Sequence, residues 1–192
     1  WIRIVRHPTL IAILLVTMVA GSGQFTTFAY IAPYVANTLD PSPNTLSLAL
    51  VLFGLAGVIG NVWATRRIGQ RGATSNVTIS MISMCVGMLT LAAIGSLWIG
   101  FIVGALTWGA GVFANNSSQQ ARLVVASPAL AGASIALNTS MIYLGQAIGT
   151  TVGGAVIAKA GYRWLPLVGA TVLLGALVLS YRATRKTAWQ PL

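Results

Sequence analysis

The stretch GNVWATRRIGQRG, residues 60–72, places three arginines and three glycines between two long apolar runs. A short basic segment between apolar runs is typical of the connections between membrane-spanning helices. The rest of the chain agrees with this interpretation, because 56% of its 192 residues are hydrophobic and only 6% are charged, against roughly 25% in soluble domains. The composition therefore predicts an integral membrane protein.

The cations are distributed along the whole chain. Eleven Lys and Arg against one acidic residue give a net charge of +10, but they fall in the connections between apolar runs and form no single patch. This distribution argues against a nucleic-acid partner and favours contact with membrane lipid headgroups. The single cysteine, Cys85, lies in an apolar run and permits no intrachain disulfide.

Six apolar runs are long enough to cross a bilayer, which needs about 20 residues per helix. The sequence predicts an all-α integral membrane protein, one domain over residues 1–192, with spans at about 10–34, 46–65, 76–94, 98–120, 131–158 and 164–181. Three crossings reverse the direction of the chain. The second three helices are therefore expected to be an inverted copy of the first three, as in many secondary transporters.

The connections alternate in charge, which predicts an orientation. Nine cations fall on one side of the predicted bundle and two, Lys159 and Arg163, on the other. The positive-inside bias predicts that both termini are cytoplasmic and that NTLDPSPN, residues 37–44, is an outside loop. The nine cations are Arg3, Arg6, Arg66, Arg67, Arg71, Arg122, Arg182, Arg185 and Lys186.

Three longer stretches carry a family resemblance: GQFTTFAYIAPYVANTL (23–39), LVLFGLAGVIGNVWATRRIGQRG (50–72) and GASIALNTSMIYLGQAIGTTVGGAVIAKAGYRW (132–164). They resemble the C-terminal six-helix half of a major facilitator superfamily transporter, in the drug:proton antiporter branch that includes arabinose-efflux-permease-like exporters. The resemblance implies half of a twelve-helix fold in the plasma (bacterial inner) membrane. It also implies an N-terminal half absent from this chain and export of a small molecule by proton antiport. Sugars, nucleosides and amphipathic drugs remain open as substrates.

In that superfamily, the connection between the second and third helices of a half carries a glycine-rich basic signature that often includes an Asp. Gly60, Arg66, Arg67, Gly69 and Arg71 match it loosely, without the acid. The arginines either hold a loop in the cytoplasm or contact the other half or lipid phosphates.

The fifth span carries two stripes. Gly145, Gly149 and Gly153 recur every four residues and predict close helix packing. The second stripe is polar, and polar groups in lipid are costly unless they pair or face water. It therefore either faces a cavity or bonds to adjacent helices, and consists of Thr139, Tyr143, Gln146 and Thr150.

The fourth and first spans offer further candidates for a cavity. Trp108 and Asn115 share a face of the fourth span, where Trp108 either forms a ligand wall or packs in the core. The later run ANNSSQQAR is interpreted as capping and interfacial groups. In the first span Pro33 is expected to bend the helix. The resemblance implies that the first, second, fourth and fifth helices line a cavity; the candidates are Gln24, Thr27, Phe28, Trp108, Asn115, Thr139, Tyr143 and Gln146.

Titratable groups are scarce in the predicted spans. The acid Asp40 falls in the predicted outside loop, and the only histidine, His7, at a membrane boundary. Any proton-coupling acid is therefore expected in the absent half. No metal, cofactor or enzymatic activity is predicted, because the spans lack a ligand cluster or a Ser-His pair. The alternative is a free-standing six-helix channel or scaffold that acts as a dimer.

Overall fold

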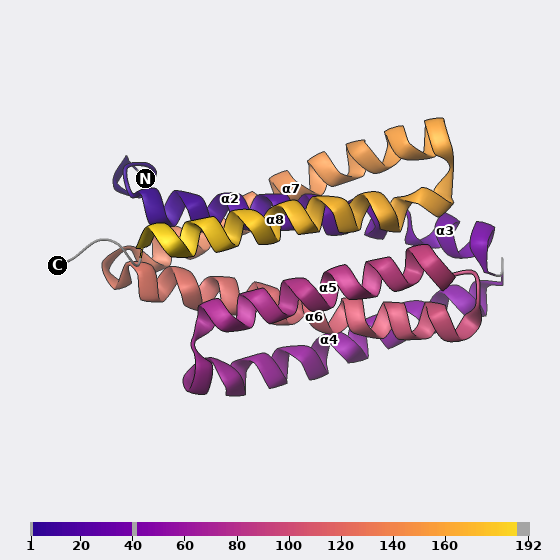
Figure 1. Cartoon of the computed structure of the whole chain (residues 1–192), viewed down its shortest axis with the longest axis horizontal. Coiled ribbons are helices and arrows are strands. Elements are labelled where there is room, and N and C mark those ends of the chain that lie inside the picture. The colour runs from indigo at the N-terminus through magenta and orange to yellow at the C-terminus, as the bar shows by residue number, and fades with distance from the viewer. Residues whose placement is uncertain (1, 40–41, 188–192) are drawn as a thin grey trace.

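The computed structural model describes residues 2–39 and 42–187, a range that excludes Asp40. Six helices in it are long and apolar enough to cross a membrane, so the predicted all-α class and the six spans are confirmed. Their arrangement is shown in Figure 1. The helices are α2 (Pro8–Phe28), α4 (Pro43–Arg71), α5 (Ala73–Ile94), α6 (Trp98–Ala126), α7 (Ala131–Ala160) and α8 (Leu165–Thr187); the short elements are α1 (Ile2–Val5), α3 (Ile31–Thr38), η1 (Pro128–Leu130) and η2 (Tyr162–Trp164).

The prediction that RRIGQRG forms a connecting loop is wrong. Helix α4 continues to Arg71, and Gly72 alone separates it from α5. Gly72 has φ +78°, a conformation that glycine adopts without the steric cost of a Cβ. The helix extends beyond its apolar run because long arginine side chains can reach polar surroundings from a helical backbone. Arg66, Arg67 and Arg71 therefore occupy the last turns of α4.

The first span is broken, where the sequence predicted one run from 10 to 34 with a bend. Helix α2 ends at Phe28, and α3 restarts at Ile31 after Ala29 and Tyr30. Pro33 has no N–H to donate to Ala29, which explains why the α-helical ladder does not pass through this point. Tyr30 instead donates its backbone N–H to the Thr27 carbonyl at 3.1 Å, which gives a tighter turn.

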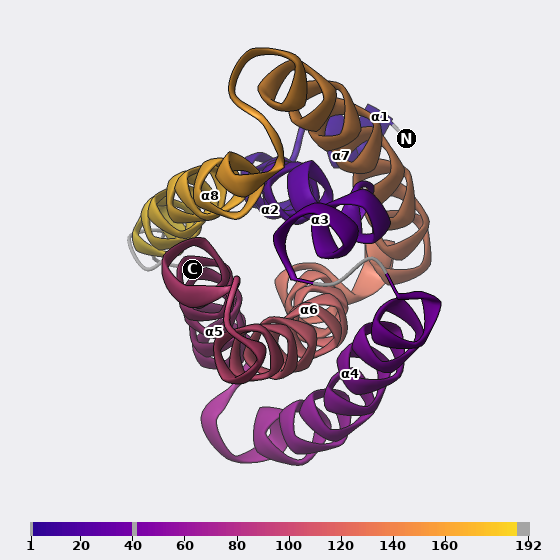
Figure 2. The ribbon, with the colours of Figure 1, turned by 90° about the vertical axis from the view of Figure 1, so that its right-hand side faces the viewer.

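The packing follows the predicted inverted repeat. Helix α2, the first of its triplet, packs on α7 and α8, while α6, the first of the second triplet, packs on α4 and α5. The first triplet is α2, α4 and α5, and the second is α6, α7 and α8. Exchange of the two triplets converts one set of contacts into the other, and α5 of the first triplet also packs on α8 of the second. Figure 2 shows α4 and α7 at opposite edges of the bundle, with α2 and α6 between them.

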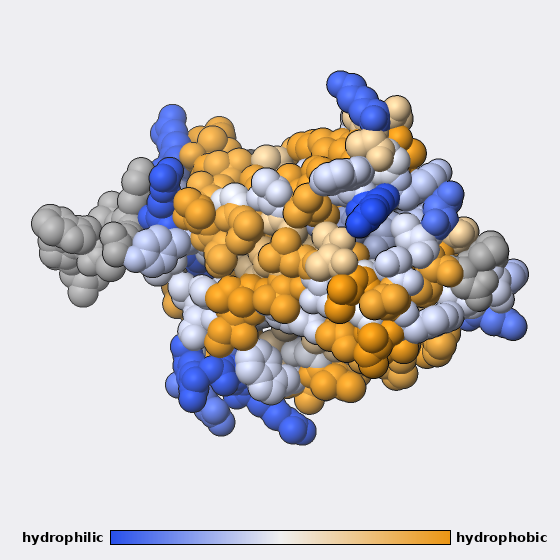
Figure 3. All heavy atoms as spheres, turned by 45° about the vertical axis from the view of Figure 1, so that its right-hand side comes forward, coloured by the Kyte–Doolittle hydropathy of each residue, from blue (hydrophilic) through white to orange (hydrophobic). Residues whose placement is uncertain are grey.

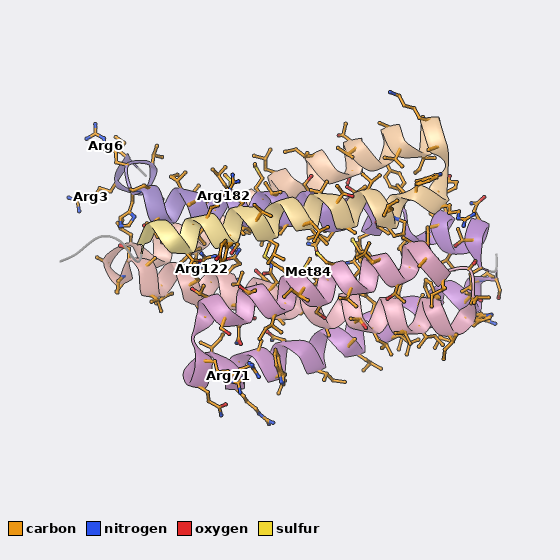
Figure 4. The ribbon with its side chains drawn as sticks, in the orientation of Figure 1. Arg3, Arg6, Arg71, Met84, Arg122 and Arg182 are labelled. Atoms are coloured by element: carbon orange, nitrogen blue, oxygen red, sulfur yellow. The ribbon has the colours of Figure 1, made fainter. Side chains whose placement is uncertain are left out.

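Basic residues gather at one end of the bundle, here called the basic end. Figure 4 shows Arg3, Arg6, Arg71, Arg122 and Arg182 toward this end, where α8 also ends. On the face drawn in Figure 3, hydrophobic residues cover most of the surface between strongly hydrophilic groups nearer the ends. The side chains of Arg185 and Lys186 lie outside the described part of the chain.

The charge pattern predicted that Arg122 lies in a connection between helices, and this prediction is wrong. It lies within α6 and is only 6% exposed, because α6 continues to Ala126 rather than ending near residue 120. Its guanidinium donates to Ser180 Oγ at 2.9 Å and Thr184 Oγ1 at 3.0 Å, both on α8. These bonds join α6 to α8 at the basic end.

Glycines set the distance between the packed helices. A Cβ at Gly145, Gly149 or Gly153 would overlap a backbone carbonyl oxygen of α2. Gly60 has the same relation to the Ala110 backbone of α6, so this residue packs α4 against α6 and belongs to no connector. Such small-residue contacts allow membrane helices to approach backbone to backbone.

Candidate functional site

A cavity of about 250 Å³ lies on the side of the bundle between α4 and α7. Side chains of α2, α4, α5, α6 and α7 line it, with Met84 as the α5 contribution. Figure 4 shows Met84 near the middle of the bundle. Because the inverted repeat places α2 and α6 centrally and α4 and α7 at the edges, the cavity has a central floor and two side walls.

One part of the cavity wall is aromatic. Phe25 and Phe28 of α2, Phe53 of α4 and Phe113 of α6 line it. Phe28 and Phe53 lie 5.2 Å apart between ring centroids, and both contact Trp108 edge to face, at 6.0 and 4.9 Å. This geometry suits aromatic quadrupoles and holds the two phenyl rings in place.

Trp108 itself is 1% exposed and belongs to the hydrophobic core. It is not among the residues that line the cavity between α4 and α7. The structure therefore places it behind the aromatic wall, where it supports Phe28 and Phe53. Its indole N–H is buried without a hydrogen-bond partner among the described residues.

The other part of the wall is polar and uncharged. Five amides, Asn116 among them, and one hydroxyl contribute, from α2, α6 and α7, and no charged side chain is among the described residues that line the cavity. Amides supply both donors and acceptors. The cavity therefore offers apolar rings on one part and neutral hydrogen-bonding groups on another; the polar groups include Thr17, Gln24, Asn115, Gln119 and Gln146.

Several of these amides are buried without a partner. Gln119 is fully buried, and neither its Oε1 nor its Nε2 has a hydrogen bond within the described residues. The same holds for Asn115 Oδ1 and for Nδ2 of Asn138, which lies beside Thr17. Because most buried polar atoms in proteins are hydrogen-bonded, this group marks a place where a ligand or water is expected.

The eight cavity candidates predicted from sequence separate into three groups. Gln24, Phe28, Asn115 and Gln146 line the cavity. Thr27 and Trp108 are buried in the bundle, and a Cβ on Gly169 would lie 3.2 Å from Thr27 Oγ1, so Thr27 faces α8. Thr139 and Tyr143 are exposed on α7, with Tyr143 65% exposed. The predicted polar stripe of the fifth span thus contributes only Gln146 to this cavity.

Sequence reasoning missed Gln119, Thr17, Phe25, Phe53 and Phe113. The interpretation of ANNSSQQAR as capping and interfacial groups is wrong, because α6 continues through this run and buries Gln119 completely. The four-residue spacing of Asn115 and Gln119, which places both on one helix face, was the signal available in the sequence.

The basic segment lies apart from the cavity. The Arg67 guanidinium sits over the Trp63 ring, 4.9 Å from its centroid, in a cation-π contact. Gly69 has open space where a Cβ would be, so packing does not require glycine there. Within the described residues, no group of three His, Cys, Asp or Glu gathers in a way that would hold a metal ion.

A cavity on the side of a six-helix inverted-repeat bundle defines a class, the membrane transporters built from inverted repeats. The family is shown by the sequence as a whole: the family model described as Major Facilitator Superfamily matches residues 13–192. The chain therefore belongs to the major facilitator superfamily, and it is an integral membrane protein.

Two kinds of relative illustrate this membership. The chain is 28% identical over 186 residues to the inner membrane transport protein YdhP of Escherichia coli strain K12. The matched region covers 96% of this chain and 48% of the relative. It is 29% identical over 175 residues to a probable sugar efflux transporter of Helicobacter pylori. This match covers 91% of the chain and 44% of that relative. The chain thus spans about half the length of the curated relatives that it matches.

Proposed function

We propose that this chain is the C-terminal six-helix half of a transporter that exports a small molecule from the cell by proton antiport. The observation that carries the proposal is the cavity between α4 and α7, lined by neutral amides and phenyl rings. It forms one wall of the transport site, and the other six-helix half supplies the opposite wall. The half-length match to the two transporters supports a partner half.

The exposed faces of the edge helices support a second bundle. Helix α4 exposes Leu55, Val58 and Ile59 at more than half of their surface, and α7 exposes Tyr143. Lipid covers apolar side chains well, but a tyrosine and a threonine such as Thr139 in a span are costly unless they find polar partners. Their place on α7, at the edge of the cavity, suits contact with the other half.

Proton coupling is assigned to the other half. Asp40 is the only Asp or Glu of the chain and lies outside the described residues. The cavity lining among the described residues carries no titratable side chain that would exchange protons near neutral pH. In this proposal the cavity binds substrate, and a carboxylate across it carries the proton.

The basic end is assigned to the cytoplasm. Cations favour the cytoplasmic side of bacterial membrane proteins, and Arg3, Arg6, Arg71 and Arg182 lie toward one end (Figure 4). Arg163, in η2, lies at the opposite end, where α7 joins α8. Both termini are therefore cytoplasmic in this proposal, and the protein is assigned to the bacterial inner membrane.

The proposal is tested with inverted membrane vesicles that contain the protein expressed from its complete reading frame. A respiratory substrate generates the proton gradient, and uptake of two radiolabelled probes is measured, the neutral phenyl β-D-glucopyranoside and the cation tetraphenylphosphonium. Uptake of either probe above empty vesicles, abolished by a protonophore and altered by Gln146→Ala at equal abundance, is expected. Vesicles that match empty ones for both probes would reject the proposed function.

A further inference from the structure

We infer that Gln119 is a specificity-determining residue of the cavity and that its amide selects a neutral ligand bearing both hydrogen-bond donors and acceptors, such as a polyhydroxylated molecule. The inference builds on the proposed transport function and names the substrate class for its site. It starts from a feature that transport alone does not require, a completely buried amide with nothing bonded to either of its polar atoms.

Gln119 is placed for contact with a ligand. It lines the cavity from α6, and Asn115, four residues earlier on the same face, lines it as well. Asn115 is 8% exposed, and its Oδ1 also lacks a partner among the described residues. Two N–H donors of Gln119 and two carbonyl oxygens are thus left without hydrogen bonds beside one cavity.

Thr17 of α2 lines the same cavity and bonds to a further amide, Asn138. Its hydroxyl lines the cavity and donates to Asn138 Oδ1 of α7 at 2.8 Å. This bond fixes the orientation of the Asn138 amide and leaves Nδ2 with no partner within the described chain. Asn138 itself is not among the residues that line the cavity, so the polar groups of the lining come from α2, α6 and, through Gln146, α7.

The chemistry of these groups favours a neutral ligand. No described residue that lines the cavity is charged, so an ionic ligand would lose its hydration there without an opposite charge from this wall. A hydroxyl both donates and accepts, and so pairs with an amide in either orientation. Phe28 and Phe53 lie in the same cavity and offer phenyl rings to the apolar carbon face of a ring-shaped ligand.

Gln119→Met separates a ligand-binding role from a structural one. Methionine keeps the length of the side chain and removes the amide, so the ligand-free protein no longer buries the two unpaired polar atoms of Gln119. We expect the melting temperature of the ligand-free protein to rise. We also expect the affinity for phenyl β-D-glucopyranoside to fall by about tenfold, as when a ligand hydroxyl loses its buried hydrogen-bond partner.

The experiment uses the purified protein from the complete reading frame, with equilibrium dialysis of both labelled probes and thermal unfolding. Gln70→Met is the matched control, because Gln70 is exposed near the end of α4, away from the cavity. This control is expected to match the unsubstituted protein in both measurements.

Three results would overturn the inference, and they differ in whether they also reject the proposed transport function. A lower melting temperature for Gln119→Met, with unchanged affinity, would assign the amide a structural role. Export of tetraphenylphosphonium without any binding of the glucoside would leave the transport function intact and reject the neutral ligand. If neither probe is bound or transported, the proposed function and this inference are both rejected.

Discussion

The guanidinium of Arg122 in α6 donates to the side-chain oxygen of Ser180 in α8 at 2.9 Å, from a position that is only 6% exposed. A buried cation is usually paired with a carboxylate, but the described residues contain no Asp or Glu. The charge is met instead by hydroxyl and carbonyl oxygens of Ser180 and Thr184. Neutral oxygens of one helix therefore bind a cation of another.

Ser180→Ala is expected to destabilise the bundle. It removes one acceptor from a buried guanidinium, a loss of about 1–3 kcal/mol, seen as a lower melting temperature in detergent. Thr171→Ala is the control in the same helix, because the exposed Thr171 hydroxyl donates only to Leu167 of its own helix. In an Arg122→Met background, Ser180→Ala should cost much less. Equal losses in both backgrounds would show that the two residues are not coupled.

Gly149→Ala is expected to lower the abundance and thermal stability of the protein. The new Cβ would overlap the Ser22 carbonyl oxygen of α2, an atom of the backbone that cannot move aside alone. Overpacking of this kind costs roughly 1–3 kcal/mol. Gly132→Ala, at the start of the same helix with open space around it, should be tolerated. Two variants of equal stability would contradict the close approach of α2 and α7.

Hydropathy was sufficient to predict the six helices, because a bilayer requires long apolar runs whatever the tertiary contacts. It failed at the helix ends. The predicted boundaries at 65 and 120 follow the apolar residues, whereas the helical backbone continues to Arg71 and Ala126. Pro33 predicted a bend in the first span, since the missing N–H is a local property, but the sequence did not predict that the helix would end at Phe28 and restart at Ile31.

The candidate site was predictable only where one helix determines it. Spacing along α2 and α6 grouped residues by face, and of those candidates Gln24, Phe28 and Asn115 line the cavity. Phe53 required knowledge of how α4 packs against its neighbours. Tyr143 shares a helix with Gln146 yet points to an exposed face, because α7 has no helix beyond it among those described.

The orientation of α4 is expected to follow its charge, with Asn44 outside and Gln70 in the cytoplasm. Both residues are exposed, near opposite ends of this helix. In a Cys85→Ala background, cysteine at position 44 should react with a membrane-impermeant maleimide in intact cells, and cysteine at 70 only after permeabilisation. The reverse labelling pattern would invert the topology.

In the proposed transporter, this bundle supplies one wall of a site that a second six-helix half completes. The most direct test is proton-driven uptake of phenyl β-D-glucopyranoside and tetraphenylphosphonium in proteoliposomes. They contain either the 192-residue chain alone or the chain co-expressed with the segment encoded upstream. We expect no gradient-dependent uptake by the chain alone and restored uptake on co-expression, because a single bundle cannot alternate access around a site. Gradient-dependent uptake of either probe by the chain alone would contradict it.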